Sequence, residues 1–167
     1  MQGDLFANFT PDEPGEAKKS NLETLESLTY NYQLIDTEEK RRKIIQKLLT
    51  SKILSLDTET TGTEPMDAEL VGMSFSITEN QAFYVPVPDN REEALKIVNE
   101  FRPIFENENS LKVGQNIKYD MIVLENYGVQ VKGALFDTMI AHYVLQPELR
   151  HGMDYLAEIY LHYQTIH

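Results

Sequence analysis

Two acidic motifs contain the residues best suited to chemistry, and the first is Asp57-Thr58-Glu59. Its two carboxylates stand two positions apart, so on a β-strand they point to the same side, with Cα atoms roughly 6.5–7 Å apart. Two such carboxylates are costly to bury unless they are solvated or neutralised. A hard divalent cation with oxygen ligands is a natural neutraliser. The competing interpretation is an exposed strand end beside a turn, and for this motif alone it is the more common case.

The second motif is Asn116-Ile117-Lys118-Tyr119-Asp120. On a helix, Asn116 and Asp120 share one face. Asn116 stands at the expected N-cap, and Asp120 falls in the first turn, where the helix dipole favours negative charge. An acid there needs no further function, so this motif is also ambiguous by itself. Together the motifs can bring three carboxylates to one sheet edge, where they can hold two divalent ions that activate a water and stabilise the leaving oxygen of a phosphodiester.

The hydrophobic pattern predicts the elements that must position these motifs. Strands are expected at residues 30–34, 53–58, 70–77, 82–87, 111–114 and 134–136. Helices are expected after the capping residue Thr37 and at residues 91–105, 116–127, 137–145 and 153–163, with Pro103 ending or kinking the second of them. A hairpin-sized connection makes the third and fourth strands antiparallel. The fold class is therefore α/β, a mixed sheet with an antiparallel meander followed by parallel strands and with helices on its faces.

Composition narrows the class of protein. The chain has 167 residues, 41% hydrophobic and 25% charged, which suits one soluble domain with its own core. It has no cysteine, which excludes disulfides and thiolate metal sites. Its apolar stretches are far short of the ~20 residues needed to span a bilayer, and its N-terminus lacks a signal-peptide pattern. We therefore expect a cytoplasmic protein without a membrane partner.

The net charge of −12 argues against nucleic acid, whose binders usually carry a basic face. Two features weaken that argument. Residues 1–28 carry six acids and two lysines, and we interpret them as a flexible acidic linker that precedes a domain at residues 29–167. A site built from carboxylates is also acidic by design, and bound divalent cations reverse its local potential.

The wording of both motifs resembles a known family. The stretch 56–62, Leu-Asp-Thr-Glu-Thr-Thr-Gly, is similar to the first motif of the DEDD 3′→5′ exonucleases. The stretch 113–120, Val-Gly-Gln-Asn-Ile-Lys-Tyr-Asp, resembles their second motif as found in the proofreading domain of bacterial DNA polymerase I. Later segments at 70–77, 84–87, 136–139 and 151–157 also resemble that domain, in order. The resemblance covers residues 30–167 and implies a ribonuclease H-like fold.

The resemblance also implies a role for each matching residue. Asp57, Glu59 and Asp120 become catalytic metal ligands for two divalent ions, Mg²⁺ or Mn²⁺, with Zn²⁺ an option at one site. The cleft for the 3′-terminal nucleotide is implied to be lined by Thr58, Thr63, Gln115, Asn116 and Tyr119. Thr63 stands where the family often has a leucine that contacts the terminal base.

The family requires a fourth carboxylate, from a third motif with a tyrosine four residues before an aspartate. That pattern does not occur after the second motif. The resemblance therefore implies a fragment truncated within the exonuclease domain, with its metals incompletely bound and with weak or absent activity by itself. Asp137 and Asp154 are interpreted as helix-capping acids rather than ligands. Arg150 either meets a phosphate or is a solvated loop residue.

For the intact parent, the resemblance implies hydrolysis of the 3′-terminal phosphodiester of DNA, as proofreading in replication and repair. The substrate would be a frayed single-stranded 3′ end, since an unpaired base is easier to pull from the duplex. The implied partners are the 5′ nuclease and polymerase domains of the same chain, in a bacterial cytoplasm. Two alternatives stay open: a vestigial exonuclease-fold scaffold between polymerase modules, and an RNA-trimming DEDD exonuclease.

Overall fold

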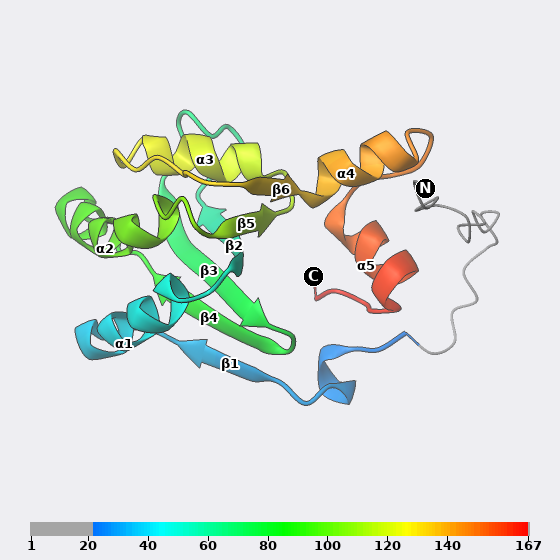
Figure 1. Ribbon diagram of the computed structural model, residues 1–167, viewed down its shortest axis with the longest axis horizontal. Helices are drawn as coiled ribbons and strands as arrows, with labels where there is room; N and C mark the ends of the chain where they lie inside the picture. The colour runs from blue at the N-terminus through cyan, green and yellow to red at the C-terminus, as the bar shows by residue number, and fades with distance from the viewer. Residues whose placement is uncertain (1–21, 167) are drawn as a thin grey trace, which may run out of the picture.

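The computed structural model describes residues 22–166, whose strands form one six-stranded mixed sheet (Figure 1). The strands are β1 (Asn31–Leu34), β2 (Ile53–Thr60), β3 (Leu70–Thr78), β4 (Gln81–Pro86), β5 (Leu111–Gly114) and β6 (Leu135–Asp137). The helices are α1 (Glu38–Leu49), α2 (Arg91–Phe105), α3 (Ile117–Glu125), α4 (Thr138–Leu145) and α5 (Met153–Leu161), with a 3₁₀ turn, η1, at Leu25–Ser27. No helix in this part of the chain is long and apolar enough to cross a membrane.

The strand order across the sheet is β1-β4-β3-β2-β5-β6. β2, β3 and β4 form the predicted antiparallel meander, and the tight turn between β3 and β4 places Asn80 in the left-handed region, with φ 57°. β5 runs parallel to β2, and β6 runs parallel to β5. The mixed α/β sheet is therefore confirmed. The sequence pattern did not reveal that β1 pairs parallel to β4 at the edge, where all four of its residues are exposed.

Alternate residues of the meander build the core. Leu54 and Leu56 of β2 are buried in one cluster with side chains from α1, α2 and α3, which cover that face of the sheet. The stacked rings of Phe75 and Phe101, with centroids 5.3 Å apart, join β3 to α2. Because successive strand residues point to opposite faces, Asp57 projects away from this core.

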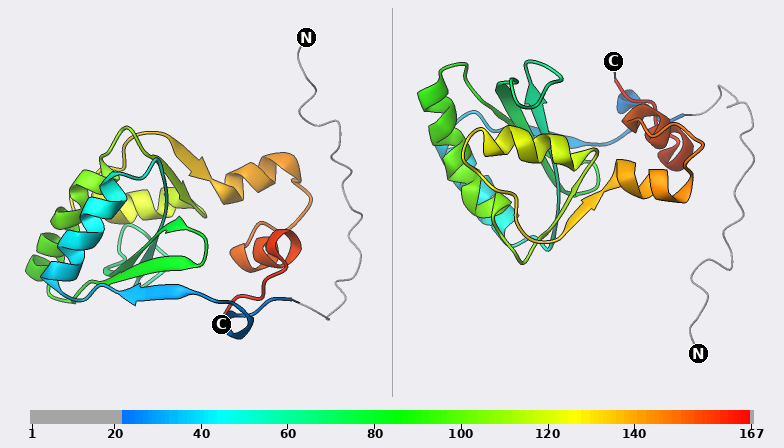
Figure 2. Two further views of the ribbon diagram at one scale, coloured as in Figure 1. Left: turned by 60° about the horizontal axis from the view of Figure 1, so that its bottom comes forward. Right: turned by 90° about the horizontal axis from the view of Figure 1, so that it is seen from above.

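Helices α4 and α5 stand apart from the other helices, beyond one end of the sheet (Figure 1 and Figure 2). They follow β6 on one side, and on the other Glu23 forms a parallel bridge with Tyr163. They keep large apolar side chains exposed, among them Val144 at 74% and Leu161 at 69%. Most of the predicted linker, residues 1–28, lies outside the described residues, and the bridge of Glu23 belongs to its described end.

The predicted helix 91–105 is confirmed as α2, and Pro103, expected to end or kink it, lies in its last turn, where a proline removes a single helical hydrogen bond. Local predictions at two other helix ends differ from the structure. Helix α3 (Ile117–Glu125) is shorter than the predicted helix 116–127, and Gly128 lies beyond its end with φ 73°. Asp154 does not cap α5: the N-cap is Gly152, and Asp154 accepts a bond from the hydroxyl of Thr165 at 2.6 Å instead.

Candidate active site

The two predicted motifs are joined directly by Thr58 and Asp120. β2 pairs with β5 only along 53–55, so its later residues face α3 on that side instead of a strand. The backbone N–H and the hydroxyl of Thr58 both donate to Oδ1 of Asp120, at 2.8 and 2.6 Å. Only 8% of Thr58 and 2% of Asp120 are exposed. Thr58, predicted to contact substrate, therefore positions a carboxylate.

The surroundings of Asp57 disfavour its ionised form. It is partly buried, and burial together with the negative charges of Asp120 and Glu59 raises its pKa to about 6. Burial also raises the pKa of Asp120, against the lowering effect of the two bonds from Thr58. The first and second motifs therefore share one electrostatic environment, in which a positive charge would be stabilising.

The donor chemistry of the three acids fits a hard divalent cation, because Asp57, Glu59 and Asp120 offer only oxygen ligands. A cation would also offset the repulsion that raises the pKa of Asp57. Across residues 22–166, however, no three or more Asp, Glu, His or Cys side chains are grouped to hold one ion. The ligand set stays a prediction.

Tyr119 ties the start of α3 to the turn after β2. Its hydroxyl donates to the carbonyl oxygen of Gly62 at 2.5 Å and lies 2.6 Å from the hydroxyl of Thr60. Thr63 follows in the same turn and is exposed. The predicted substrate residues Tyr119 and Thr63 are thus held near one another, beside the helix turn that carries Asp120.

Gln115 and Asn116 connect the second motif to the α4–α5 region. Gln115 donates from Nε2 to the carbonyl oxygen of His151 at 2.7 Å, and its Oε1 accepts from the hydroxyl of Thr138. Asn116 occupies the predicted N-cap position of α3, but it is left-handed, with φ 60° and ψ 41°, and its side chain makes no capping bond. Its backbone N–H donates to Asp137 instead, at 3.1 Å.

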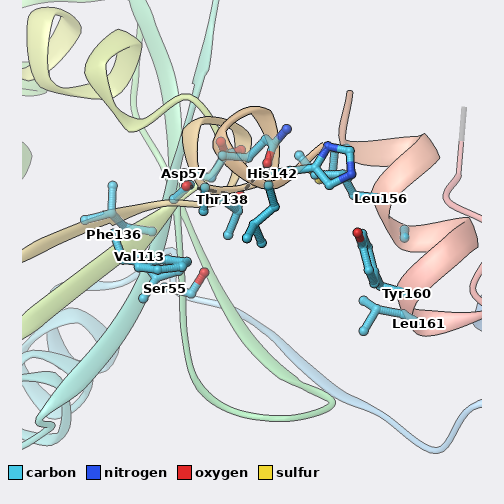
Figure 3. Close-up of a pocket in the computed structure, with 16 residues that line it drawn as sticks. Ser55, Asp57, Val113, Phe136, Thr138, His142, Leu156, Tyr160 and Leu161 are labelled. Carbon is cyan, nitrogen blue, oxygen red and sulfur yellow. Dashed lines mark hydrogen bonds between the residues drawn. The ribbon is translucent and has the colours of Figure 1, made fainter. Parts of the chain in front are cut away.

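A cleft of about 620 Å³ opens between the sheet and helices α4 and α5 (Figure 3). Asp57 and Gln115 line its sheet side, and His142, Leu156 and Tyr160 line its helical side. The floor of the cleft is the exposed face of the sheet, where Ser55, Val113 and Phe136 lie side by side on β2, β5 and β6. The cleft therefore brings part of the predicted site to a space that can accept a substrate.

A histidine pair beside the cleft was not predicted. Nδ1 of His142 lies 2.7 Å from Nδ1 of His151, and Nε2 of His142 is buried without a hydrogen-bond partner among residues 22–166. The two residues are nine positions apart, across a helix end and a loop, a spacing without a characteristic signature. Arg150 is exposed and lies over the ring of Tyr155, 4.9 Å from its centroid.

Replacing Thr58 by valine tests the link between the motifs. Valine keeps the shape and the backbone N–H, but Asp120 loses the hydroxyl bond while its carboxylate stays buried. We expect the free energy of unfolding at pH 7.5 to fall by about 1–3 kcal/mol in urea denaturation. Thr50→Val, which removes an exposed bond to the carbonyl of Lys47, should cost less than about 0.5 kcal/mol. Equal losses in both variants would contradict the buried link.

Comparison with known proteins places this geometry in a family. A family model described as 3′-5′ exonuclease matches residues 32–167. DNA polymerase I of Borreliella burgdorferi is 32% identical over 157 residues, and DNA polymerase I of Pseudomonas aeruginosa is 33% identical over 175 residues. These matches cover 92% and 96% of this chain but span only 17% and 19% of the two polymerases.

A solved structure supports the fold. Brucella melitensis NrnC with bound Mg²⁺ aligns with a TM-score of 0.64 at 18% identity, over 83% of this chain and 65% of that one. At that identity the likeness shows the ribonuclease H-like fold alone, whereas the family match extends over nearly all of the described residues. On the strength of that match and of its polymerase relatives, the chain belongs to the family of 3′–5′ exonuclease domains found in DNA polymerase I.

Proposed function

We propose that this chain removes nucleotides from the 3′ end of DNA by hydrolysing the terminal phosphodiester bond. The observation that carries the proposal is the meeting of Asp57 and Asp120, one from each motif, near enough for the charge of Asp120 to raise the pKa of Asp57. Asp57 also lines the cleft. Carboxylates with perturbed pKa values in a cleft are typical of functional sites.

In this proposal, Asp57, Glu59 and Asp120 are the residues that would hold divalent cations. The all-oxygen donor set suits Mg²⁺ or Mn²⁺, with Zn²⁺ an option at one position, and NrnC, which has the same fold, was solved with Mg²⁺. When bound, such cations supply an activated water and stabilise charge on the phosphate and the leaving oxygen. Thr58 favours the ionised form of Asp120, because its two bonds lower the pKa of that carboxyl.

The remaining residues would bind and orient the substrate. Tyr119 anchors the turn that contains Thr63, and Gln115 lines the cleft. We place the 3′-terminal nucleotide among Thr63, Gln115, Asn116 and Tyr119. The bonds that Gln115 makes to His151 and Thr138 keep that side chain in place before a substrate arrives, which lowers the entropic cost of binding.

The role of a longer parent protein is also a proposal. The chain spans 17% and 19% of the two DNA polymerases I described above. In a protein of that kind it would proofread DNA beside 5′ nuclease and polymerase domains, in the bacterial cytoplasm. A frayed single-stranded 3′ end would be its substrate.

Trimming of a 5′-labelled DNA single strand, with the chain in excess and with Mg²⁺ or Mn²⁺, tests the proposal. We expect slow, metal-dependent release of mononucleotides, because the sequence holds three of the four carboxylates that the resemblance implies. Asp57→Asn should reduce the rate by roughly 100-fold or more, the loss of several kcal/mol of metal stabilisation.

An RNA strand of matching sequence provides the comparison. Faster trimming of RNA than of DNA would assign the chain to RNA processing instead. Trimming of neither strand by a folded chain, at any metal concentration, would leave a scaffold that keeps only the fold, and would overturn the proposal.

A further inference from the structure

We propose that Asp137 is a positioning residue for the active site, tying the start of α3, which carries Asp120, to the start of α4. This inference rests on the proposed function, because it concerns how that site is held. Oδ1 of Asp137 accepts from three backbone N–H groups: Met139 at 2.9 Å, Ile140 at 3.1 Å and Asn116 at 3.1 Å. The third donor lies 21 positions earlier in the chain.

A second cap in the same molecule shows that the third bond is additional. Asn90 caps α2 by accepting from the backbone N–H groups of Glu92 and Glu93, both at 3.0 Å. That pair is what an N-cap supplies. Asp137 makes the equivalent pair for α4 and also holds Asn116, so this bond serves α3.

Asn116 is the residue that needs to be held. Its left-handed backbone is uncommon for a residue other than glycine and requires support from its surroundings. The direction in which the chain leaves Asn116 decides where α3 begins, and Asp120 lies in the first turn of that helix. A shift at Asn116 would therefore move Asp120 relative to Thr58, whose bonds of 2.6 and 2.8 Å tolerate little displacement.

The sheet delivers Asp137 to this place. β6 runs parallel to β5 with Asp137 opposite Gly114, two residues before Asn116. The next residue, Thr138, adds a second link, because its hydroxyl lies 3.2 Å from the carbonyl oxygen of Gly114 and also contacts the side chain of Gln115. Asp137, the last residue of β6, and Thr138, the first residue of α4, thus both contact the segment that leads into α3.

The carboxylate of Asp137 also contributes to the electrostatics of the site. Asp137 lies near enough to raise the pKa of Asp120, and its Oδ2 is buried without a partner within residues 22–166. Serine or asparagine would cap α4 without placing a charge beside Asp120.

Three variants distinguish the bond between Asp137 and Asn116 from the capping of α4 by Asp137. Asp137→Ser retains a hydroxyl that can cap α4 but is one atom shorter, so it gives up the bond to Asn116. Asp137→Asn keeps Oδ1 and should restore that bond. Asn90→Ala is the matched control, since it removes a cap of the same geometry at α2. Hydrogen exchange of the Asn116 amide, compared with amides of the core, and Mn²⁺ affinity of the whole chain are measured in each.

In Asp137→Ser we expect the Asn116 amide to exchange about tenfold faster, since its only described acceptor is gone, and Mn²⁺ to bind several-fold more weakly. Asp137→Asn should return both quantities to within about threefold of the unaltered chain. If Asp137 only stabilised the fold as a helix cap, Asn90→Ala would accelerate exchange of the Asn116 amide as much as Asp137→Ser does. That result would overturn the inference. Failure of Asp137→Asn to restore slow exchange would overturn it as well. If the unaltered chain binds no Mn²⁺, the proposed function fails, while the exchange series still decides the role of Asp137.

Discussion

Asp57→Asn is expected to stabilise the folded chain at pH 7.5 while it lowers the proposed nuclease activity. A pKa raised from 3.8 to about 6 means that the folded state disfavours the ionised carboxylate. A shift of that size corresponds to about 3 kcal/mol, and solvent screening of this partly exposed group reduces the expected gain to about 1–2 kcal/mol. Asparagine has nearly the same shape without the charge. Urea denaturation measures the gain, and the exposed Asp89→Asn is the control.

The pH dependence gives the sign of the effect. Between pH ~4 and ~6, folded Asp57 holds a proton that the unfolded chain has released, so stability falls as the pH rises through about 6. Below pH ~4 the carboxyl is protonated in both states, and Asp57→Asn should then differ little from the unaltered chain. A gain that persists undiminished at pH 3.5 would show that the charge of Asp57 is not its cause.

Metal binding should reverse the loss of stability that the charge of Asp57 causes at pH 7.5. A cation held by Asp57 binds the folded state alone, so Mg²⁺ should raise the melting temperature of the unaltered chain at pH 7.5. In Asp57→Asn the same addition should have a much smaller effect, because a ligand is lost. If Mg²⁺ stabilises both proteins equally, Asp57 does not bind it, and the proposed ligand set is wrong.

The alternation of side chains along a strand made part of this site predictable from the sequence. The part that depends on how far β2 pairs with β5 was not predictable. Periodicity places Asp57 and Glu59 on one face of a strand and Asp120 in the first turn of a helix. It does not say that β5 pairs with β2 only along 53–55, which is why the N–H of Thr58 is free to bind Asp120. That contact joins residues 62 positions apart and belongs to the tertiary structure.

Backbone conformation limited the prediction in a second way. Asparagine before a helix normally indicates a side-chain cap, but Asn116 adopts the left-handed region and is held through its own N–H. The acid that holds it, Asp137, was predicted correctly as the cap of α4. Its bond to Asn116 depends on β6 pairing with β5, and a strand of three residues is too short for its sequence to predict that pairing.

The connection that leads into β6 requires a glycine at position 133. This glycine has φ 88°, and a Cβ there would lie 3.0 Å from the carbonyl oxygens of Asn107 and Ser110 and 3.1 Å from that of Glu108. These are backbone atoms of one turn, which the buried ammonium of Lys112 also binds through the carbonyl of Asn107. The turn therefore cannot move away without breaking that contact.

Gly133→Ala is therefore expected to lower the free energy of unfolding by roughly 2–4 kcal/mol, the sum of left-handed strain and overpacking against three carbonyls. Gly62→Ala is the matched control, because its Cβ would meet nothing within 4 Å, and it should change stability by less than about 0.5 kcal/mol. Urea denaturation at pH 7.5 measures both. Because Gly133 precedes β6, the variant should also accelerate amide exchange at Asn116 beyond its effect on the core. A loss shared evenly by all amides would mean that the connection stabilises the fold without positioning Asp137.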